Sequence, residues 1–157
     1  MTTLHAEHRY HLDVAPEVAF DYLCDPAHDA QWQAACVEAA RLDPGAALAV
    51  DSRYRIVFSF MGRHAAFVSR VTELAPPAEY AFESVEGPFP YRGRYSFRAA
   101  PQGGVDVHWQ FWAEPGRYFG IVPATLLRKA MVHQVEKDVV GLRKRFSAGP
   151  EGRSFLT

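Results

Sequence analysis

Arg128 is the side chain whose chemistry is most out of place in this 157-residue chain. It falls within the apolar stripe of a predicted helix, beside Ala124, Val132 and Val135 rather than with the lysines. A buried guanidinium keeps its charge and therefore needs an anionic or strongly polar partner. Two interpretations stay open: Arg128 meets an acid, enol or phosphate group of a ligand, or its stem follows the rim of a sheet and its charge reaches solvent.

Three tyrosines are weaker candidates for chemistry. Tyr54, Tyr91 and Tyr95 could each donate a hydrogen bond to an enolising substrate. Tyrosines inside a protein core, however, commonly do no more than find a partner for their own hydroxyl group. The sequence does not decide between these two roles.

Three histidines near the start of the chain, His5, His8 and His11, have the side-chain type of a metal site. They lie in a predicted strand, where successive side chains alternate between faces, so His8 would point away from the other two. No nucleotide-binding glycine loop, nucleophile elbow or zinc-protease motif accompanies them. We therefore expect neither a metal nor a cofactor.

The elements that must position these residues form a long run of short strands. After a first strand and two short helical segments, six β-type segments are separated by turn residues, most of them at hairpin length, which favours an antiparallel meander. The predicted strands are Leu4–Leu12, Cys36–Leu42, Ser52–Phe60, His64–Leu74, Glu79–Val85, Tyr91–Ala99 and Val105–Ala113, and the helical segments begin at Pro16 and span Ala27–Trp32.

One face of this sheet is predicted to be covered. In the strand from Tyr91 to Ala99, aromatic residues alternate with arginines at a period of two, and the strand from Val105 to Ala113 shows the same alternation. Ala124–Phe146 is the only segment long enough to cover that face, as a helix with an apolar stripe at 3.6-residue spacing. Residues 1–146 are thus expected to form one domain, and residues 147–157 a flexible tail.

Composition excludes several classes of partner. The formal net charge is −1, so no global field would attract nucleic acid. The longest uncharged apolar stretch is far shorter than the roughly 20 residues of a membrane span, and no secretory signal is recognisable. Cys24 and Cys36 fit neither a redox motif nor a disulfide framework and are interpreted as reduced thiols. We expect a cytoplasmic protein without a transmembrane segment.

Several segments resemble one known superfamily. Residues 15–26 (Ala-Pro-Glu-Val-Ala-Phe-Asp-Tyr-Leu-Cys-Asp-Pro) look like its opening helix and stop, and residues 71–77, 93–97 and 105–109 resemble its later strands. This is the START-like, or SRPBCC, superfamily, in particular its polyketide cyclase/dehydrase and lipid-transport branch. The resemblance spans Leu4 to about Phe146. It implies an α+β helix-grip fold, in which a curved antiparallel sheet of about seven strands surrounds a long C-terminal helix, with two short helices between strands one and two.

The resemblance also implies a cavity between the sheet and the long helix that accepts a small hydrophobic molecule. The residues support this in part, since the predicted covered face is apolar with a few hydroxyl groups, the usual composition of a small-molecule pocket. The same side chains could instead form a solid core. The candidate ligand-binding residues are Tyr54, Phe58, Phe67, Ser69, Phe82, Tyr91, Tyr95, Phe97, Trp109, Arg128, Met131 and Val135.

Three functions remain open. The first is binding of a lipid-like or polyketide-like ligand, with cyclase or dehydratase activity not decided by the sequence. The second is a carrier or chaperone for a lipid or quinone that catalyses nothing. The third is a protein-interaction domain without a ligand, which would bind a partner or a second copy in a homodimer through Arg92, Arg94 and Arg98 or through Phe155 and Leu156.

Overall fold

The computed structural model describes residues 3–147. In this part of the chain, seven strands, three α-helices and one short 3₁₀ helix follow the predicted order. The elements are β1 (Leu4–Leu12), α1 (Pro16–Leu23), η1 (Pro26–His28), α2 (Asp29–Trp32), β2 (Cys36–Arg41), β3 (Arg53–Phe60), β4 (Arg63–Ala75), β5 (Glu79–Glu86), β6 (Tyr91–Ala99), β7 (Val105–Ala113) and α3 (Ala124–Phe146). The predicted tail lies outside the described residues apart from Ser147.

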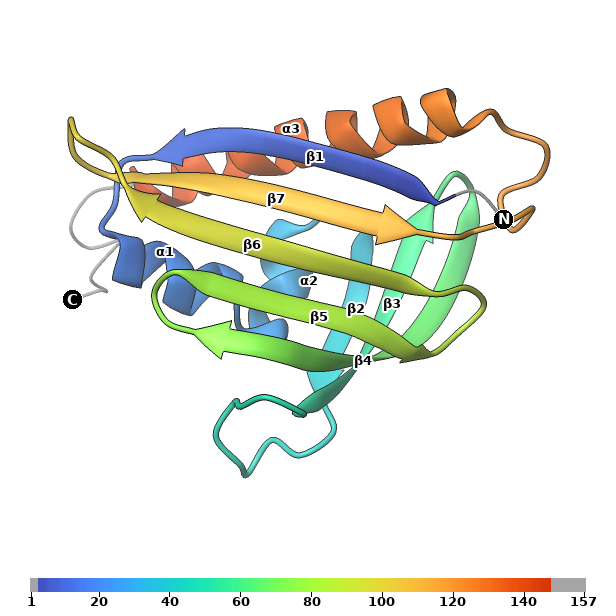
Figure 1. The fold of residues 1–157 in the computed structure, drawn as a ribbon, viewed down its shortest axis with the longest axis horizontal. Helices are drawn as coiled ribbons and strands as arrows, with labels where there is room; N and C mark the ends of the chain where they lie inside the picture. The colour runs from blue at the N-terminus through green and yellow to red at the C-terminus, as the bar shows by residue number, and fades with distance from the viewer. Residues whose placement is uncertain (1–2, 148–157) are drawn as a thin grey trace.

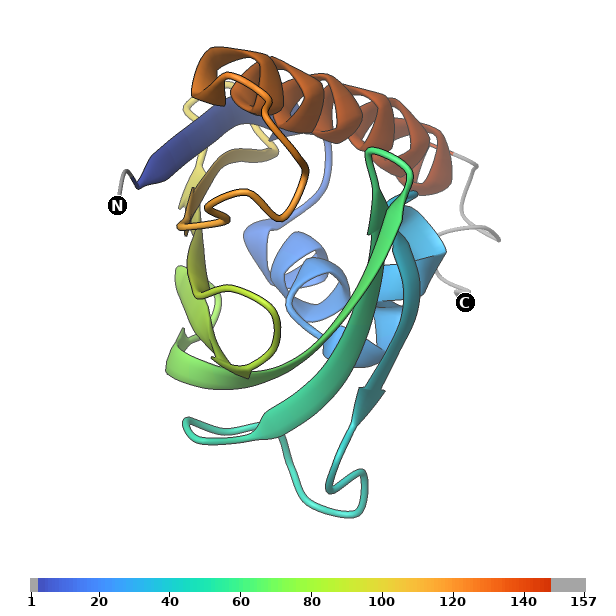
Figure 2. The same ribbon diagram turned by 90° about the vertical axis from the view of Figure 1, so that its right-hand side faces the viewer.

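The seven strands form one antiparallel sheet in the order β1-β7-β6-β5-β4-β3-β2. Consecutive strands from β2 to β7 pair as a meander, and β1 joins the free edge of β7. The sheet curves strongly, α3 lies across its open side, and α1 and α2 sit within the curve (Figures 1 and 2). The predicted helix-grip arrangement is therefore confirmed.

Local chemistry explains the sharp connection between β3 and β4. Only Met61 and Gly62 separate the two strands, and both have positive φ angles, 53° and 77°. This backbone matches the right-handed twist of a two-residue hairpin, and glycine adopts it without the steric cost of a side chain. The turn lies at the end of the molecule where the β5–β6 and β7–α3 connections also lie (Figure 1).

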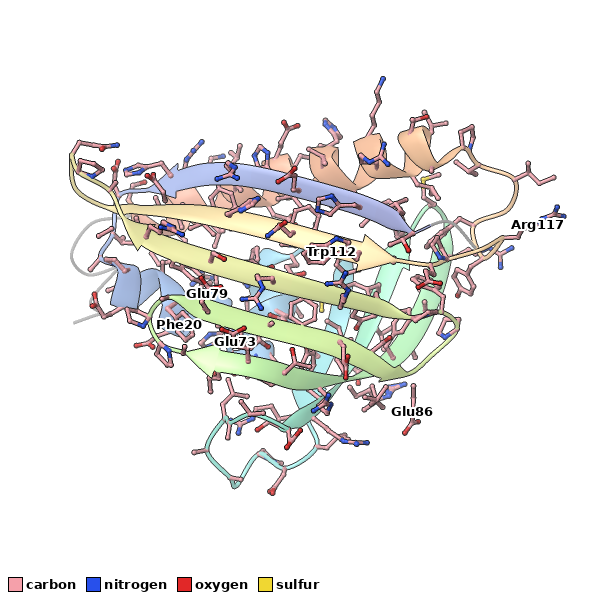
Figure 3. The ribbon with its side chains drawn as sticks, in the orientation of Figure 1. Phe20, Glu73, Glu79, Glu86, Trp112 and Arg117 are labelled. Carbon is pink, nitrogen blue, oxygen red and sulfur yellow. The ribbon has the colours of Figure 1, made fainter. Side chains whose placement is uncertain are left out.

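The alternation predicted for β6 holds in the structure. Tyr91, Tyr95 and Phe97 are buried on the concave face, whereas the arginines between them lie on the convex face. There Arg94 forms ion pairs with Glu73 and Glu79, at 2.6 and 2.7 Å. These carboxylates and the neighbouring Trp112 belong to the outer surface of the sheet (Figure 3).

Helix α3 also covers the exposed edge of β1. The Nε of Arg128 donates a hydrogen bond to the backbone carbonyl of His5 at 2.7 Å, and the Nε of Arg143 donates one to that of His11 at 3.2 Å. An edge strand otherwise presents unpaired carbonyl groups that can pair with another chain. Two arginines of the helix thus occupy acceptors that the sheet leaves free.

The buried face of α3 differs from the predicted stripe at its first turn. Ala124 is exposed, and Leu127 is the buried residue of that turn, at 5 % exposure, followed by Val139 and Leu142. The predicted stripe began at Ala124, whose methyl group contributes little apolar area, and did not include the larger side chain of Leu127.

No helix in residues 3–147 has both the length and the apolar character that a bilayer crossing requires.

Candidate ligand cavity

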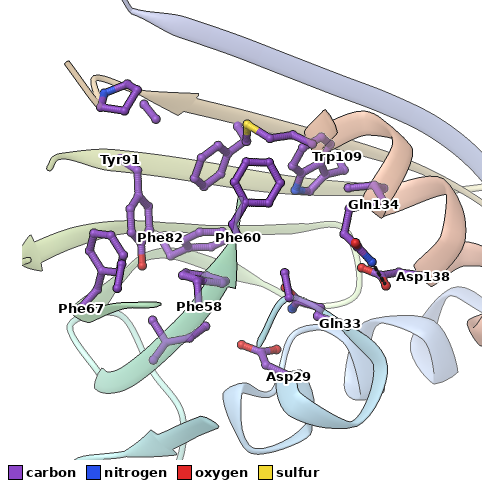
Figure 4. Close-up of a pocket in the computed structure, with 18 of the residues that line it drawn as sticks. Asp29, Gln33, Phe58, Phe60, Phe67, Phe82, Tyr91, Trp109, Gln134 and Asp138 are labelled. Atoms are coloured by element: carbon purple, nitrogen blue, oxygen red, sulfur yellow. Dashed lines mark hydrogen bonds between the residues drawn. The ribbon is translucent and has the colours of Figure 1, made fainter. Parts of the chain in front are cut away.

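A cavity of about 160 Å³ lies between the concave face of the sheet and α3. Side chains from the sheet, α2, α3 and the β7–α3 connection surround it (Figure 4). Its lining residues are Leu4, Tyr10, Leu23, Asp29, Trp32, Gln33, Ala35, Tyr54, Ile56, Phe58, Phe60, Arg63, Ala65, Phe67, Tyr80, Phe82, Phe89, Tyr91, Tyr95, Trp109, Phe111, Ala113, Pro115, Phe119, Leu127, Met131, Gln134, Val135 and Asp138.

Two glycines make room for the aromatic wall. A side chain at Gly93 on β6 would place its Cβ 2.3 Å from the ring of Phe82, and one at Gly87 would place it 2.2 Å from the ring of Phe67. Real Cβ atoms do not approach other atoms so closely, so both rings lie directly over backbone. The absence of a side chain at these two positions lets Phe67 and Phe82 lie flat along the sheet and leaves space above them.

Four aromatic residues gather at the end of the cavity where the β3–β4, β5–β6 and β7–α3 connections meet (Figure 2). This aromatic cap consists of Phe60, Phe89, Tyr118 and Phe119, whose rings pack at centroid distances of 5.1 to 5.8 Å. The hydroxyl group of Tyr118 also donates to the backbone carbonyl of His64 at 2.9 Å, which ties the β7–α3 connection to the hairpin. The cap thus lies over this end of the cavity.

Polar side chains collect at a different part of the wall. Asp29 and Gln33 approach from α2 and the residue after it, and Gln134 and Asp138 approach from α3 (Figure 4). Asp29 is 7 % and Asp138 8 % exposed. We call these four residues the polar end. Asp138 is held in place, because its Oδ1 accepts hydrogen bonds from the backbone N–H of Ala34 at 3.1 Å and from Nε2 of Gln134 at 3.2 Å.

Both carboxyl groups of the polar end are perturbed by their surroundings. Burial, and secondarily the charge of Asp25, raises the pKa of Asp29 well above its usual value, and a hydrogen bond with Gln33 offsets part of this. Burial also raises the pKa of Asp138, while the hydrogen bonds from Ala34 and Gln134 lower it in part. Buried acids with raised pKa values inside a cleft are typical of functional sites.

Hydroxyl groups line the sheet side of the cavity. The Tyr91 hydroxyl is hydrogen-bonded to Ser69 Oγ, and Tyr54 interacts with both Ser69 and Tyr80. Burial raises the pKa of Tyr54, Tyr80 and Tyr91 above the usual value for tyrosine, so these phenols remain uncharged at neutral pH. They are neutral groups that already satisfy one another.

The structure brings most of the candidate residues together. Nine of the twelve lie on the cavity wall: Tyr54, Phe58, Phe67, Phe82, Tyr91, Tyr95, Trp109, Met131 and Val135. Ser69 does not line the cavity but lies fully buried beneath it, where it bonds Tyr91. Phe97 is also off the wall and packs edge-on against Phe20 of α1, with ring centroids 5.3 Å apart.

Arg128 lies off the wall as well. Its Nε donates to the carbonyl of His5 on the edge of the sheet, and its side chain is partly exposed. This placement agrees with the interpretation in which the stem follows the sheet rim and differs from the one in which the guanidinium meets a ligand. Arg128 lies at the rim because the exposed backbone carbonyl of the edge strand accepts its hydrogen bond. The pattern of residue types in the sequence does not reveal such a backbone partner.

None of the four residues of the polar end was among the candidates predicted from the sequence. Gln134 and Asp138 are four residues apart and continue the helical spacing from Leu127 and Met131, so a wheel anchored on Leu127 would have placed them on the covered face. Asp29 stands in a helix of four residues, which is too short to show any periodicity. Only the fold brings it under α3.

The predicted alternation of the three histidines is confirmed. His5 stacks on Trp112 on the convex face, and His11 on that face lies 2.9 Å from carboxylates of both Asp13 and Asp106. His8 lies on the opposite face and stacks on Tyr10. The three rings therefore do not converge, and no group of metal-ligating side chains was found within residues 3–147.

Comparison with known families gives one match over nearly the whole chain. The family model described as "Polyketide cyclase / dehydrase and lipid transport" matches residues 3–147. A comparison with curated proteins finds no match.

Several solved structures share the fold at low sequence identity. A START superfamily protein from Mycobacterium smegmatis has a TM-score of 0.74 at 15% identity, covering 91% of this chain and 99% of its own. The Zhui aromatase/cyclase from a Streptomyces species has a TM-score of 0.70 at 16% identity, covering 94% and 99%. A protein from Thermus thermophilus has a TM-score of 0.73 at 20% identity, covering 92% and 97%.

Proposed function

Because this chain belongs to the polyketide cyclase / dehydrase and lipid transport family, whose model covers residues 3–147, we propose that it binds a small hydrophobic molecule in the cavity beneath α3. The guest is lipid-like or polyketide-like and packs against the aromatic wall. Fold alone does not carry function, so the proposal depends on the site itself.

The observation that carries the proposal is the cavity's lining. Aromatic and aliphatic side chains form most of it, including Phe58, Phe67 and Trp109, and a few polar groups are grouped at one end. Ligand pockets have this composition, since apolar contacts supply affinity and a few polar groups fix orientation. A core without a guest would have no reason to leave an opening, because protein interiors are normally close-packed.

The volume limits what fits without rearrangement. A cavity of about 160 Å³ is close to the roughly 150 Å³ of an apolar cavity known to hold benzene. One aromatic ring of a guest therefore fits the present shape. A longer polyketide or lipid chain requires the aromatic cap to move outward, so that the rest of the molecule extends past Phe60 and Phe119.

Native mass spectrometry of the protein purified from its own host tests this proposal. We expect a co-purified small molecule in the wild type and its loss in Ala65→Leu, because Ala65 is buried on the cavity wall and a larger side chain fills the space. Ala66→Leu is the matched control, since Ala66 is exposed and points to the other face of β4. Retention of the adduct in Ala65→Leu would contradict a guest in this cavity.

A second function is favoured by the polar end, namely catalysis of proton transfer on the bound guest. Asp29 has a pKa raised by burial and by Asp25, and a carboxyl group with a raised pKa is better suited than an exposed one to act as a general acid or base. In a cyclisation, such a group would remove a proton from a carbon between two carbonyl groups, and the resulting carbanion would attack a third carbonyl carbon. The proton would then return to the new alkoxide.

The co-purified guest can also be used as a substrate to test whether the protein catalyses this reaction. We expect Asp29→Asn to keep binding the guest, because the volume is preserved, but to lose its conversion when the reaction is followed by chromatography, since the cyclised product is an isomer of the guest with the same mass. Equal, measurable conversion by wild type and Asp29→Asn would contradict the role of Asp29. No conversion by the wild type would leave a carrier that binds without turnover, which is the rival function.

A further inference from the structure

The cavity wall contains two acidic residues and one basic residue, and these lie at different places on the wall. They determine which guests can bind, provided that the cavity has the binding function proposed above. Two carboxyl groups, Asp29 and Asp138, face the polar end. Among the described residues that line the cavity, Arg63 is the only one with a basic side chain. It is exposed and lies over the ring of Tyr118, 5.4 Å from its centroid, beside the aromatic cap. The polar end thus offers acids without a cation.

A carboxylate on the guest would be poorly accommodated at the polar end. An ionised group transferred from water to a dry site needs an opposite charge or several donors, and here it would meet two acids instead. A carboxylate placed near Arg63 would remain in solvent, where an ion pair contributes little. The wall therefore disfavours anionic guests, including fatty acids, in either orientation.

A hydroxyl group meets the opposite conditions. A carboxylate oxygen such as those of Asp138 accepts hydrogen bonds, and an alcohol or phenol has one to donate. Trp32 lines the same cavity three residues after Asp29, and its buried Nε1 has no hydrogen-bond partner within residues 3–147. An unsatisfied buried donor is costly, and an oxygen of the guest can accept its hydrogen.

We infer that the cavity selects uncharged guests bearing a hydroxyl group, an alcohol or a phenol, and rejects carboxylates of the same apolar shape. Asp29 and Asp138 determine this selection. Their oxygens accept the hydroxyl hydrogen, and the wall beside them supplies no cation that a carboxylate of the guest would need.

Isothermal titration calorimetry at neutral pH tests the inference with three matched probes: 4-ethylphenol, the 4-ethylbenzoate anion and ethylbenzene. All three share the ethyl-substituted ring and differ in the group at the polar end. We expect the phenol to bind more tightly than the benzoate by at least about tenfold, because the benzoate would lose its hydration beside two acids with no cation to pair with. Ethylbenzene should bind between the two.

A variant with amides in place of both acids assigns the effect to Asp29 and Asp138. In Asp29→Asn/Asp138→Asn, the amides keep the shape and offer N–H donors, so the affinity for the benzoate should rise and the preference for the phenol should shrink to about threefold or less. The control variant Asp21→Asn/Asp43→Asn removes the same charge from two exposed residues off the wall and should keep the wild-type preference.

The possible outcomes separate this inference from the proposed function. If the benzoate binds as tightly as the phenol to the wild type, the inference is wrong while ligand binding stands. If none of the three probes binds and no guest co-purifies, the proposed function fails instead. Loss of benzoate binding in Arg63→Gln, with the phenol unaffected, would show that the anion binds at the cap and would also overturn the inference.

Discussion

At the scale of single residues, the burial of Asp29 lowers the free energy of unfolding, and interactions elsewhere in the chain must compensate for this loss. The residue is 7 % exposed and shares the cavity wall with aromatic rings and with the other residues of the polar end. Burying an acid disfavours its charged form, which is why its pKa is raised. Residues that destabilise a fold are commonly kept where activity or binding needs them. The position of Asp29 is therefore more typical of a site than of a core.

This cost predicts a pH-dependent gain in stability for Asp29→Asn. The folded state holds the proton to a higher pH than the unfolded chain does, so wild-type stability falls as pH rises above the unfolded pKa of about 3.9. The variant lacks this loss, and its advantage should grow from acidic to neutral pH. Thermal unfolding across that range measures it, with exposed Asp21→Asn as the control. A constant or reversed difference would contradict a raised pKa for the buried Asp29 carboxyl group.

The aromatic residues that β6 and β7 place on the wall could be predicted from the alternation along these strands, and the polar end could not. Tyr95 and Trp109 belong to strands whose strict alternation assigns each side chain to a face. Asp29 and Gln33 come from short helical and irregular backbone, where no period exists, so only the closure of the sheet places them in the cavity. The family resemblance likewise predicted that a cavity exists but not the charges within it.

At the scale of elements, the contact between β5 and β6 depends on a missing side chain. Phe82 occupies the space that a Cβ at Gly93 would fill, 2.3 Å from its ring. The two residues are directly paired across the strands. Because the ring of Phe82 packs directly on the backbone of Gly93, this part of the sheet takes up less of the space beneath α3.

Gly93→Ala should therefore destabilise the protein, by about 1–3 kcal/mol, since the new methyl group overpacks the site and forces Phe82 into the cavity. Gly141→Ala is the matched control. Gly141 lies in α3, where a Cβ would meet no atom within 4 Å, so alanine there should stabilise the helix by up to about 1 kcal/mol. Chemical denaturation of both variants measures the two signs, and a neutral Gly93→Ala would contradict the tight ring contact.

The helix-to-edge contact gives a further prediction. Arg128→Met keeps the apolar stem but removes the donor to the His5 carbonyl, so the free energy of unfolding should fall by about 1–2 kcal/mol without a loss of guest affinity. Equilibrium unfolding and calorimetry with 4-ethylphenol measure the two effects. A marked loss of affinity for the phenol, with stability unchanged, would instead place the guanidinium at the ligand.

Element boundaries were predictable to a greater degree than the buried face of α3. The strands β1, β6 and β7 and the helix α3 have the expected bounds, since alternation and proline or glycine at their ends define them. The helical stripe was rotated at its first turn because Ala124 and Leu127 are both apolar and only burial distinguishes them. The spacing of apolar residues alone does not show which of two apolar side chains is the larger and the more deeply buried.

At the scale of the whole molecule, the aromatic cap covers the cavity at the end where three connections meet. Phe60, Phe89 and Phe119 come from segments far apart in the sequence, and they meet only because the meander and the β7–α3 connection close on the same side. Guest exchange past this cap requires the β7–α3 connection to separate from the β3–β4 hairpin. The hydrogen bond from Tyr118 to His64 holds these two segments together.

Tyr118→Phe should thus accelerate guest exchange. The ring stays in the cap, but the loss of one hydrogen bond, worth roughly 1 kcal/mol, should raise association and dissociation rates by about fivefold and leave the dissociation constant nearly unchanged. Line-shape analysis of 4-ethylphenol resonances by NMR measures both rates. Tyr22→Phe is the control, because it removes a hydroxyl bonded to Gln31 away from the cavity. Unaltered rates in Tyr118→Phe would mean that guests use another route.

The distribution of the three tryptophans provides a built-in optical signal. Trp32 and Trp109 border the cavity, whereas Trp112 lies on the convex face between His5 and Arg92. When a guest displaces water beside the first two indoles, their emission should shift toward the blue, while that of the third stays constant as an internal reference. Occupancy could then be followed by intrinsic fluorescence in unlabelled protein, even in a crude screen of metabolite fractions.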